Sequence, residues 1–169
     1  KGFSFKVNGK PELPNLMQLR TASRIKKDRY VGNWSGTGAG KTLSAILASR
    51  VINSKLTLIC CPNSVVNNWE SEIMEIYPNS FVQKKSFDTV SLQRSKQHKY
   101  LILNYEAFQQ SSSDDDVLHL LKNTEIDFVV IDEVHYTKQR NADLMSKRKR
   151  LISSLITELR KNSNFSVLG

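Results

Sequence analysis

The chain has 169 residues, 39% of them hydrophobic, and a formal net charge of +9 at pH 7. This length suits one domain with its own core, and the sequence has no run of the ~18 apolar residues that a membrane-spanning helix needs, so we expect no membrane partner. The excess of Lys and Arg predicts a polyanionic partner, most simply nucleic acid, although charge that only keeps a protein soluble would give the same balance.

The N-terminal sequence FSFKVNGK alternates apolar and polar residues and ends in Asn8-Gly9, which predicts a strand followed by a turn. A helical pattern extends from about Leu16 to Ile25, and the sequence YVGNW (30–34) predicts a short buried strand. We expect residues 1–15 to form an extension to a main domain that covers residues 16–169.

The next stretch, SGTGAGKT (35–42), leads into an apolar helical pattern. Glycine-rich backbone can turn successive N–H groups toward an anion, and a following helix adds its positive N-terminal end. The stretch fits the phosphate-binding P-loop, or Walker A, pattern with Ser35 at the first glycine position. In this interpretation Lys41 reaches the β- and γ-phosphates of a nucleotide, and the Thr42 hydroxyl binds Mg²⁺. A plain glycine turn would explain the glycines but not the Lys-Thr pair.

Further along the chain, apolar runs alternate with helical patterns. KLTLICCP predicts a second buried strand, which ends in two cysteines that we expect to be buried and reduced. NSVVNNWESEIMEIY predicts a helix with Asn63 or Ser64 as its N-cap. Residues 79–99 are polar and give no clear pattern. KYLILNY predicts a third strand, and a polar loop (109–116) precedes the helical sequence DDVLHLLKN.

The run IDFVVIDEVHY predicts a fourth buried strand, followed directly by Asp132 and Glu133. A carboxylate at the tip of a buried strand near a P-loop is the Walker B arrangement, in which Asp132 would hold Mg²⁺ and Glu133 would deprotonate the attacking water. An ordinary helix-capping pair of acids is the alternative. A long helix to about Lys161 carries the basic cluster KRKR (147–150), a solvated or nucleic-acid-facing surface, and FSVL begins a last strand.

Apolar strands that alternate with helices predict a three-layer α/β fold, with a mostly parallel sheet covered by helices on both faces. In such sheets ligands bind beyond the carboxyl ends of the strands. The glycine-rich loop and the Asp-Glu pair both leave strands at that edge.

SGTGAGKT and VVIDEVH together resemble motifs one and two of superfamily-two helicases and translocases, with DEVH as a DExH box. LTLICCPNSVVNNWESEI is similar to motif Ia of the chromatin-remodelling and DNA-translocase branch. The resemblance implies the first RecA-like lobe of a P-loop ATPase, with the chain ending before motif three is complete and the second lobe absent. That branch usually has Asp-Glu where this chain has Ser35-Gly36, which leaves viral, phage or restriction-type translocases open.

The resemblance implies ATP and Mg²⁺ as cofactors and assigns roles to individual residues. Glu133 would be the catalytic base, Asp132 would hold Mg²⁺, and His135 would couple the nucleotide site to the second lobe. Gln18 would read the adenine. The phosphate-binding loop would be formed by Ser35, Gly36, Thr37, Gly38, Ala39, Gly40, Lys41 and Thr42, with Lys41 also catalytic. Contacts to the nucleic-acid backbone would come from Pro62, Asn63 and Ser64.

The expected function is that of the ATP-binding lobe of a nucleic-acid-dependent motor, a helicase or double-stranded DNA translocase. We expect DNA rather than RNA as the track, contacts mainly to phosphates, and an intracellular location, in the cytoplasm, nucleoid or nucleus, or in a host cell if the protein is viral. A lone lobe should hydrolyse ATP poorly, because the second lobe supplies the arginine finger. The alternatives are a P-loop kinase or other small-molecule phosphotransferase, and a nucleic-acid-binding module with a vestigial P-loop.

Overall fold

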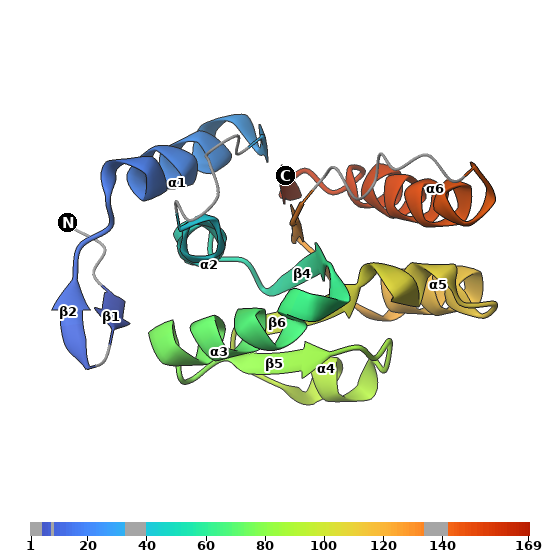
Figure 1. Ribbon diagram of the computed structural model, residues 1–169, viewed down its shortest axis with the longest axis horizontal. Coiled ribbons are helices and arrows are strands. Elements are labelled where there is room, and N and C mark those ends of the chain that lie inside the picture. Colours follow the sequence, from blue (N-terminus) through green and yellow to red (C-terminus); the bar gives the residue numbers. More distant parts are fainter. Residues whose placement is uncertain (1–4, 8, 33–39, 134–141) are drawn as a thin grey trace.

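The structure, a computed structural model, describes residues 5–7, 9–32, 40–133 and 142–169 (Figure 1). The strands are β1 (Phe5–Val7), β2 (Lys10–Glu12), β3 (Tyr30–Val31), β4 (Leu56–Cys61), β5 (Phe81–Lys84), β6 (Lys99–Asn104), β7 (Phe128–Ile131) and β8 (Ser166–Leu168). The α-helices are α1 (Leu16–Asp28), α2 (Lys41–Val51), α3 (Val66–Ile76), α4 (Val90–Arg94), α5 (Ser113–Asn123) and α6 (Ala142–Leu159). Two 3₁₀ turns are η1 (Asn63–Val65) and η2 (Tyr105–Gln109).

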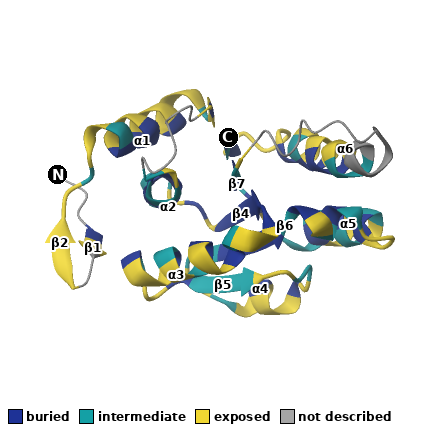
Figure 2. Cartoon of the chain, in the orientation of Figure 1, coloured by how far each residue is buried: buried dark blue, intermediate teal, exposed yellow. Residues whose placement is uncertain are grey.

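A parallel sheet forms the middle layer of the molecule. Within the described residues it has six strands, in the order β3-β8-β7-β4-β6-β5. The central strand β4 is buried at every position, as Figure 2 shows, because helices cover both of its faces. A strand in this position is mainly apolar, which is why its sequence lacks a regular alternation of apolar and polar residues. The predicted three-layer α/β fold is confirmed.

The two faces of the sheet carry separate hydrophobic clusters. Helices α1, α2 and α3 pack on one face, and α4, α5 and α6 pack on the other; Figure 1 shows α1–α3 and α5–α6 on opposite sides. Strand β4 contributes to both clusters because its side chains alternate: Ile59 and Cys61 lie in the first, and Leu58 and Cys60 lie in the second. Strand β4 therefore fixes the positions of the two helical layers relative to each other.

The predicted N-terminal strand and turn are present, and they form a β-hairpin with a second strand, β2, that the sequence did not predict. β1 and β2 pair antiparallel, and Gly9 between them has a φ of +76°, a conformation that glycine adopts at low cost. Phe5 is buried in the same cluster as α3, so the hairpin is anchored to the main domain.

The start of α3 differs from the prediction. Neither Asn63 nor Ser64 caps this helix: α3 begins at Val66, and no side chain caps it within the described residues. Pro62 has its φ fixed near −61°, and its carbonyl accepts a bond from the Val65 N–H at 3.2 Å, which closes the 3₁₀ turn η1. The predicted capping residues therefore lie in a separate, exposed turn before the helix.

The polar segment 79–99, which gave no clear pattern, contains the edge strand β5 and the short helix α4. No residue of β5 is fully buried, and in α4 only Leu92 is. Elements this short carry too few buried apolar residues for a periodicity to be detected. None of the helices in the described ranges is long and apolar enough to cross a bilayer.

The adjacent cysteines are buried free thiols, as expected. Burial raises the pKa of Cys61 to about 12 and also raises that of Cys60. Both thiols stay protonated at neutral pH, and such thiols are unreactive.

Candidate nucleotide site

The start of α2 presents backbone donors. Gly40 is its N-cap residue, with a left-handed backbone (φ 71°, ψ 37°), and no side chain of the described residues caps the helix. The Gly40 carbonyl accepts bonds from the N–H and the hydroxyl of Ser44, both at 2.9 Å. The N–H groups of the first helical turn therefore remain available to an anion. Lys41 is exposed and Thr42 half-buried at this turn.

Gln18 on α1 lies against the end of the glycine-rich loop. It is 5% exposed, and it forms a capping box with Asn15: the Gln18 N–H donates to Asn15 Oδ1 at 2.9 Å, and the Asn15 N–H donates to Gln18 Oε1 at 2.8 Å. The Gln18 Nε2 atom lies 3.2 Å from where a Cβ on residue 40 would be. A side chain at Gly40 would therefore press on Gln18 and also strain the left-handed backbone. The structure thus brings Gln18 to the loop, and its role toward adenine stays a prediction.

Asp132, directly after β7, is held at three points. Its N–H donates to the Cys60 carbonyl oxygen at 2.9 Å, which continues the pairing of β7 with β4. Its own carbonyl accepts a hydrogen bond from the Tyr105 hydroxyl. Its carboxylate Oδ2 accepts a bond from the Trp69 indole N–H at 3.0 Å. No donor among the described residues reaches the other oxygen, Oδ1, so the carboxylate is fixed on one side and open on the other.

Glu133 has an unusual backbone for its residue type. Its φ is +54°, in the left-handed region that residues with a side chain rarely adopt, and its side chain is exposed. Such a conformation costs of order 1–3 kcal/mol, and Arg29, Asn53 and Lys85 adopt it elsewhere in the chain. The conformation turns the chain sharply at the carboxyl edge of the sheet, where we expect the base.

The residues present fit a Mg²⁺ ion that arrives with a nucleotide. Mg²⁺ takes six oxygen ligands and is usually held by one or two carboxylates together with substrate phosphates and water. The available donors are the open side of the Asp132 carboxylate and the Thr42 hydroxyl. Within the described residues no group of three or more His, Cys, Asp or Glu side chains could hold a metal ion on its own. The donor set therefore suits metal bound together with phosphates.

Pro62, Asn63 and Ser64 lie at the same edge of the sheet, directly after β4. Asn63 and Ser64 are exposed, whereas Pro62 is buried. Because β4 and β7 are adjacent parallel strands, their carboxyl ends place η1 and Asp132 at one edge. Other predicted site residues fall outside the described residues: Ser35, Gly36, Thr37, Gly38, Ala39 and His135.

Two residues at this edge were not assigned a role from the sequence, namely Trp69 and Tyr105. The sequence places Trp69 on the apolar face of α3, where it does pack, at 2% exposure. A buried indole N–H usually finds an acceptor, so the residue type itself signals a polar contact somewhere. Which acceptor it meets depends on the packing of α3 against the sheet, and no local pattern contains that information.

The basic cluster 147–150 makes intramolecular contacts on α6. Lys147 and Arg150 both pair with Asp114 at the start of α5, with N–O distances of 3.2 and 3.0 Å. These two cations therefore join the α5 and α6 helices, while the Arg150 side chain remains 65% exposed.

A third cation of the cluster, Arg148, also faces the protein. Its guanidinium lies over the Tyr105 ring, 5.3 Å from the centroid, and so contacts the residue that holds the Asp132 carbonyl. Lys149 is exposed and forms no ion pair within the described ranges. Three of the four cations therefore have a structural role in contacts within the protein.

Replacing both Lys147 and Arg150 with Gln should lower stability and leave nucleic-acid binding unchanged. Exposed ion pairs contribute about 0.2–1 kcal/mol each, and 1 kcal/mol shifts the Tm of a domain this size by roughly 2–4 °C. Thermal unfolding and a titration of labelled duplex DNA measure the two quantities. A markedly lower DNA affinity at an unchanged Tm would contradict the structural role.

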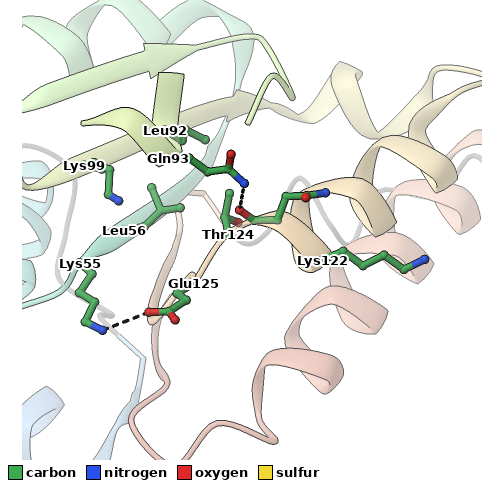
Figure 3. Close-up of a pocket in the computed structure, with 9 residues that line it drawn as sticks. Lys55, Leu56, Leu92, Gln93, Lys99, Lys122, Thr124 and Glu125 are labelled. Atoms are coloured by element: carbon green, nitrogen blue, oxygen red, sulfur yellow. Dashed lines mark hydrogen bonds and ion pairs between the residues drawn. The ribbon is translucent and has the colours of Figure 1, made fainter. Parts of the chain in front are cut away.

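A pocket drawn in Figure 3 lies at the opposite edge of the sheet. Its lining includes Lys55 just before β4, Lys99 at the start of β6 and Glu125 before β7, so it opens at the amino ends of the strands. Lys55 and Glu125 pair with each other at 3.0 Å. The residues that line this pocket include none of the predicted site residues.

Comparisons with known proteins identify a family and a similar fold. The family described as "Type III restriction enzyme, res subunit" matches residues 13–165. The fold is similar to that of the UvsW helicase from bacteriophage T4, with a TM-score of 0.64 and 15% sequence identity, over 98% of this chain. The chain spans 55% of the length of that helicase chain. No curated protein sequence matches.

Proposed function

We propose that this chain, which belongs to the family of the type III restriction enzyme res subunit, is the first RecA-like lobe of a superfamily-two helicase or translocase. It would be the ATP-binding lobe of a nucleic-acid-dependent motor. The observation that carries the proposal is the position of two segments at one edge of the sheet. The start of α2, with Lys41 and Thr42, and the residues directly after β7, Asp132 and Glu133, both lie at the carboxyl ends of the strands. The family match gives no support to a small-molecule kinase. Because Ser35-Gly36 stand where the chromatin-remodelling branch usually has Asp-Glu, a restriction-type or phage motor remained an alternative. Membership of the chromatin-remodelling branch stays a prediction.

In this proposal each site residue that the structure describes contributes to binding or hydrolysing Mg-ATP. The first-turn N–H groups of α2 and the Lys41 ammonium bind the phosphates. The Thr42 hydroxyl and the open side of the Asp132 carboxylate hold the metal. When bound, Mg²⁺ would neutralise charge that develops on the phosphates during hydrolysis. Glu133 orients a water molecule and accepts its proton.

The second lobe and the nucleic acid are the proposed partners. The second lobe would supply the arginine finger, and such residues raise kcat by ~10³–10⁵ where they have been measured. The net charge of +9 and the exposed η1 turn support binding to nucleic-acid phosphates, with DNA as the favoured track. We infer an intracellular location from this partner.

Ser64→Asp should weaken nucleic-acid binding by about tenfold or more, because placing like charges side by side costs on the order of several kcal/mol. The loss should be similar on two unrelated duplexes, since phosphate contacts carry no sequence information. The measurement is the affinity for labelled duplex DNA, single-stranded DNA and RNA over a range of salt concentrations.

Ser64→Ala is the matched control. It removes the hydroxyl but leaves the backbone N–H donors of η1, so the affinity should change only a few-fold. If Ser64→Asp binds as tightly as the wild type, η1 does not contact the track. A wild-type affinity that is independent of salt would count against a phosphate-binding surface altogether.

A further inference from the structure

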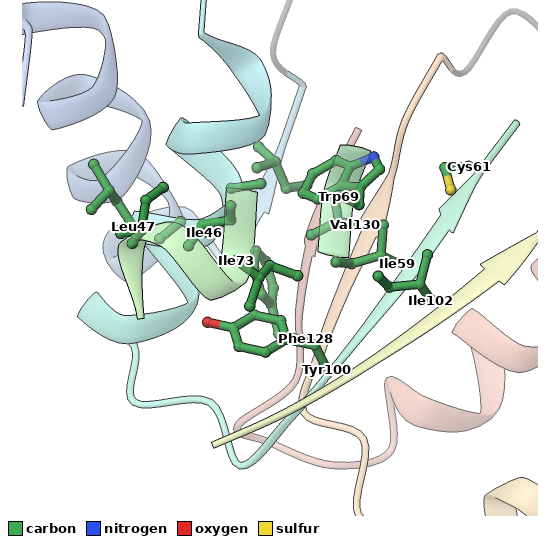
Figure 4. Packing of buried hydrophobic residues seen from close by; sticks show 14 of the residues in the cluster. Ile46, Leu47, Ile59, Cys61, Trp69, Ile73, Tyr100, Ile102, Phe128 and Val130 are labelled. Carbon is green, nitrogen blue, oxygen red and sulfur yellow. The ribbon is translucent and has the colours of Figure 1, made fainter. Parts of the chain in front are cut away.

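The Trp69 side chain joins the hydrophobic core to the carboxylate of Asp132. Its ring lies in the cluster on the α1–α3 face, together with Ile59, Cys61 and Val130 of the sheet (Figure 4). Its single polar atom, Nε1, donates to Asp132 Oδ2 at 3.0 Å. The indole is thus apolar on its faces and polar only where it meets the carboxylate.

This hydrogen bond fixes an otherwise soft torsion. The terminal torsion of an Asp side chain has a broad energy minimum, so main-chain contacts alone do not set the plane of its carboxylate. The bonds to Cys60 and Tyr105 hold the main chain of Asp132, whereas the bond from Trp69 holds the side chain. Occupation of Oδ2 leaves Oδ1 as the oxygen that can face a metal ion or its water ligands.

The indole is itself held in place. Val66 and Ile73, one turn of α3 before and after it, are fully buried and belong to the same cluster. Close-packed side chains cannot rotate without disturbing their neighbours. The donor therefore has a fixed position, and the carboxylate must adapt to it.

We propose that Trp69 is a positioning residue that orients the Asp132 carboxylate for Mg²⁺. The inference rests on the proposed function, because it assumes that Asp132 holds the metal of Mg-ATP. Residues that hydrogen-bond to metal ligands set the orientation of those ligands, and their loss typically lowers metal affinity or activity by ~10–100-fold.

Trp69→Phe tests the proposal because it keeps a large aromatic ring and removes the N–H donor. The readout is the affinity for a fluorescent ATP analogue, measured in EDTA and over a range of Mg²⁺ concentrations. In EDTA the variant should bind as the wild type does. The Mg²⁺ concentration at half-maximal enhancement should rise by ~10–100-fold. An unchanged Mg²⁺ dependence would overturn the proposal.

Tyr100→Phe is the matched control, since it also removes one buried hydrogen-bonding group from the same cluster. The Tyr100 hydroxyl contacts Ser49 at 2.8 Å and Arg50 at 3.2 Å, and neither residue belongs to the proposed site. This variant should lose stability and keep the wild-type Mg²⁺ dependence. If it shifts the Mg²⁺ dependence as much as Trp69→Phe, the effect is general loosening of the core and the proposal fails.

A second measurement does not depend on the folding of Trp69→Phe. The chain has two tryptophans, so Trp34→Phe leaves Trp69 as the single fluorophore. Its emission should change when Mg²⁺ is added to the nucleotide complex, and no change would contradict the proposal. If the wild type binds no nucleotide at all, the proposed function fails, whereas nucleotide binding with an unaltered Trp69 response counts against the positioning role alone.

Discussion

Lys41→Ala should weaken ATP binding by about 10- to 100-fold. Lys41 is the side-chain cation at the first turn of α2, beside N–H groups that no side chain of the described residues caps. A hydrogen bond to a charged group contributes about 1.5–3 kcal/mol, and the upper end of this range corresponds to on the order of 100-fold in affinity. Because Lys41 is exposed, its removal should not unfold the protein. Titration with a fluorescent ATP analogue measures the effect.

Lys27→Ala is a suitable control for this experiment. Lys27 is an exposed lysine in the last turn of α1, away from the start of α2, and its loss should leave ATP affinity as it is. Equal affinities of the wild type and Lys41→Ala would refute the assignment of this loop to phosphate binding.

Glu133→Gln should leave ATP bound and reduce turnover by ~10²–10⁴, the range that a positioned general base supplies. Glutamine has nearly the same shape but cannot accept the proton of water. The strain of the left-handed backbone (φ +54°) is the same for both residues, so stability should be unchanged. The measurements are ATP titration and steady-state hydrolysis, in a protein that carries both lobes and with saturating nucleic acid.

Glu106→Gln provides the matched acid-to-amide control. Glu106 is exposed at the same edge of the sheet, in η2, and accepts a bond from the Asn104 side chain at 2.9 Å. Its replacement should leave turnover within a few-fold of the wild type. If Glu133→Gln behaves the same way, Glu133 is a turn residue and not the base. Transfer of phosphate to a small molecule, in place of release, would instead favour the kinase alternative.

The central part of the fold could be predicted because burial on both faces forces an apolar sequence. This is why LTLICC and YLILN indicate β4 and β6 without any structure. The edge strand β5 and the helix α4 were missed because they are short and have almost no fully buried residues. The 3₁₀ turn η1 was missed for another reason: Asn63 and Ser64 are good capping residues, but Pro62 closes a tighter turn before the helix begins.

In the candidate site too, some residues could be predicted from short local patterns, whereas others depend on contacts between segments that are distant in the sequence. Lys41, Thr42 and Asp132 stand in short patterns whose spacing is dictated by a loop and one strand. The contact between Trp69 and Asp132 joins residues that are 63 positions apart in the sequence. It depends on the packing of α3 against the sheet, in which β4 and β7 are adjacent strands. The basic cluster again depends on distant information: Lys149 and Arg150 are exposed, as its composition suggested, but the pairing of Lys147 and Arg150 with Asp114, on another helix, could not be read from the sequence.

The burial of β4 on both faces also bears on how the protein unfolds. Alternate residues of this strand line two clusters, so removal of either helical layer would expose one side of β4 to water. The two layers therefore share one cooperative transition, as expected of a single domain, and neither can melt independently. Among the described residues, the proposed nucleotide site draws on α1, α2 and α3 but takes no side chain from α4, α5 or α6. The folded state of the site nevertheless depends on the layer formed by α4, α5 and α6. Substitutions in that layer can therefore abolish activity by unfolding the protein.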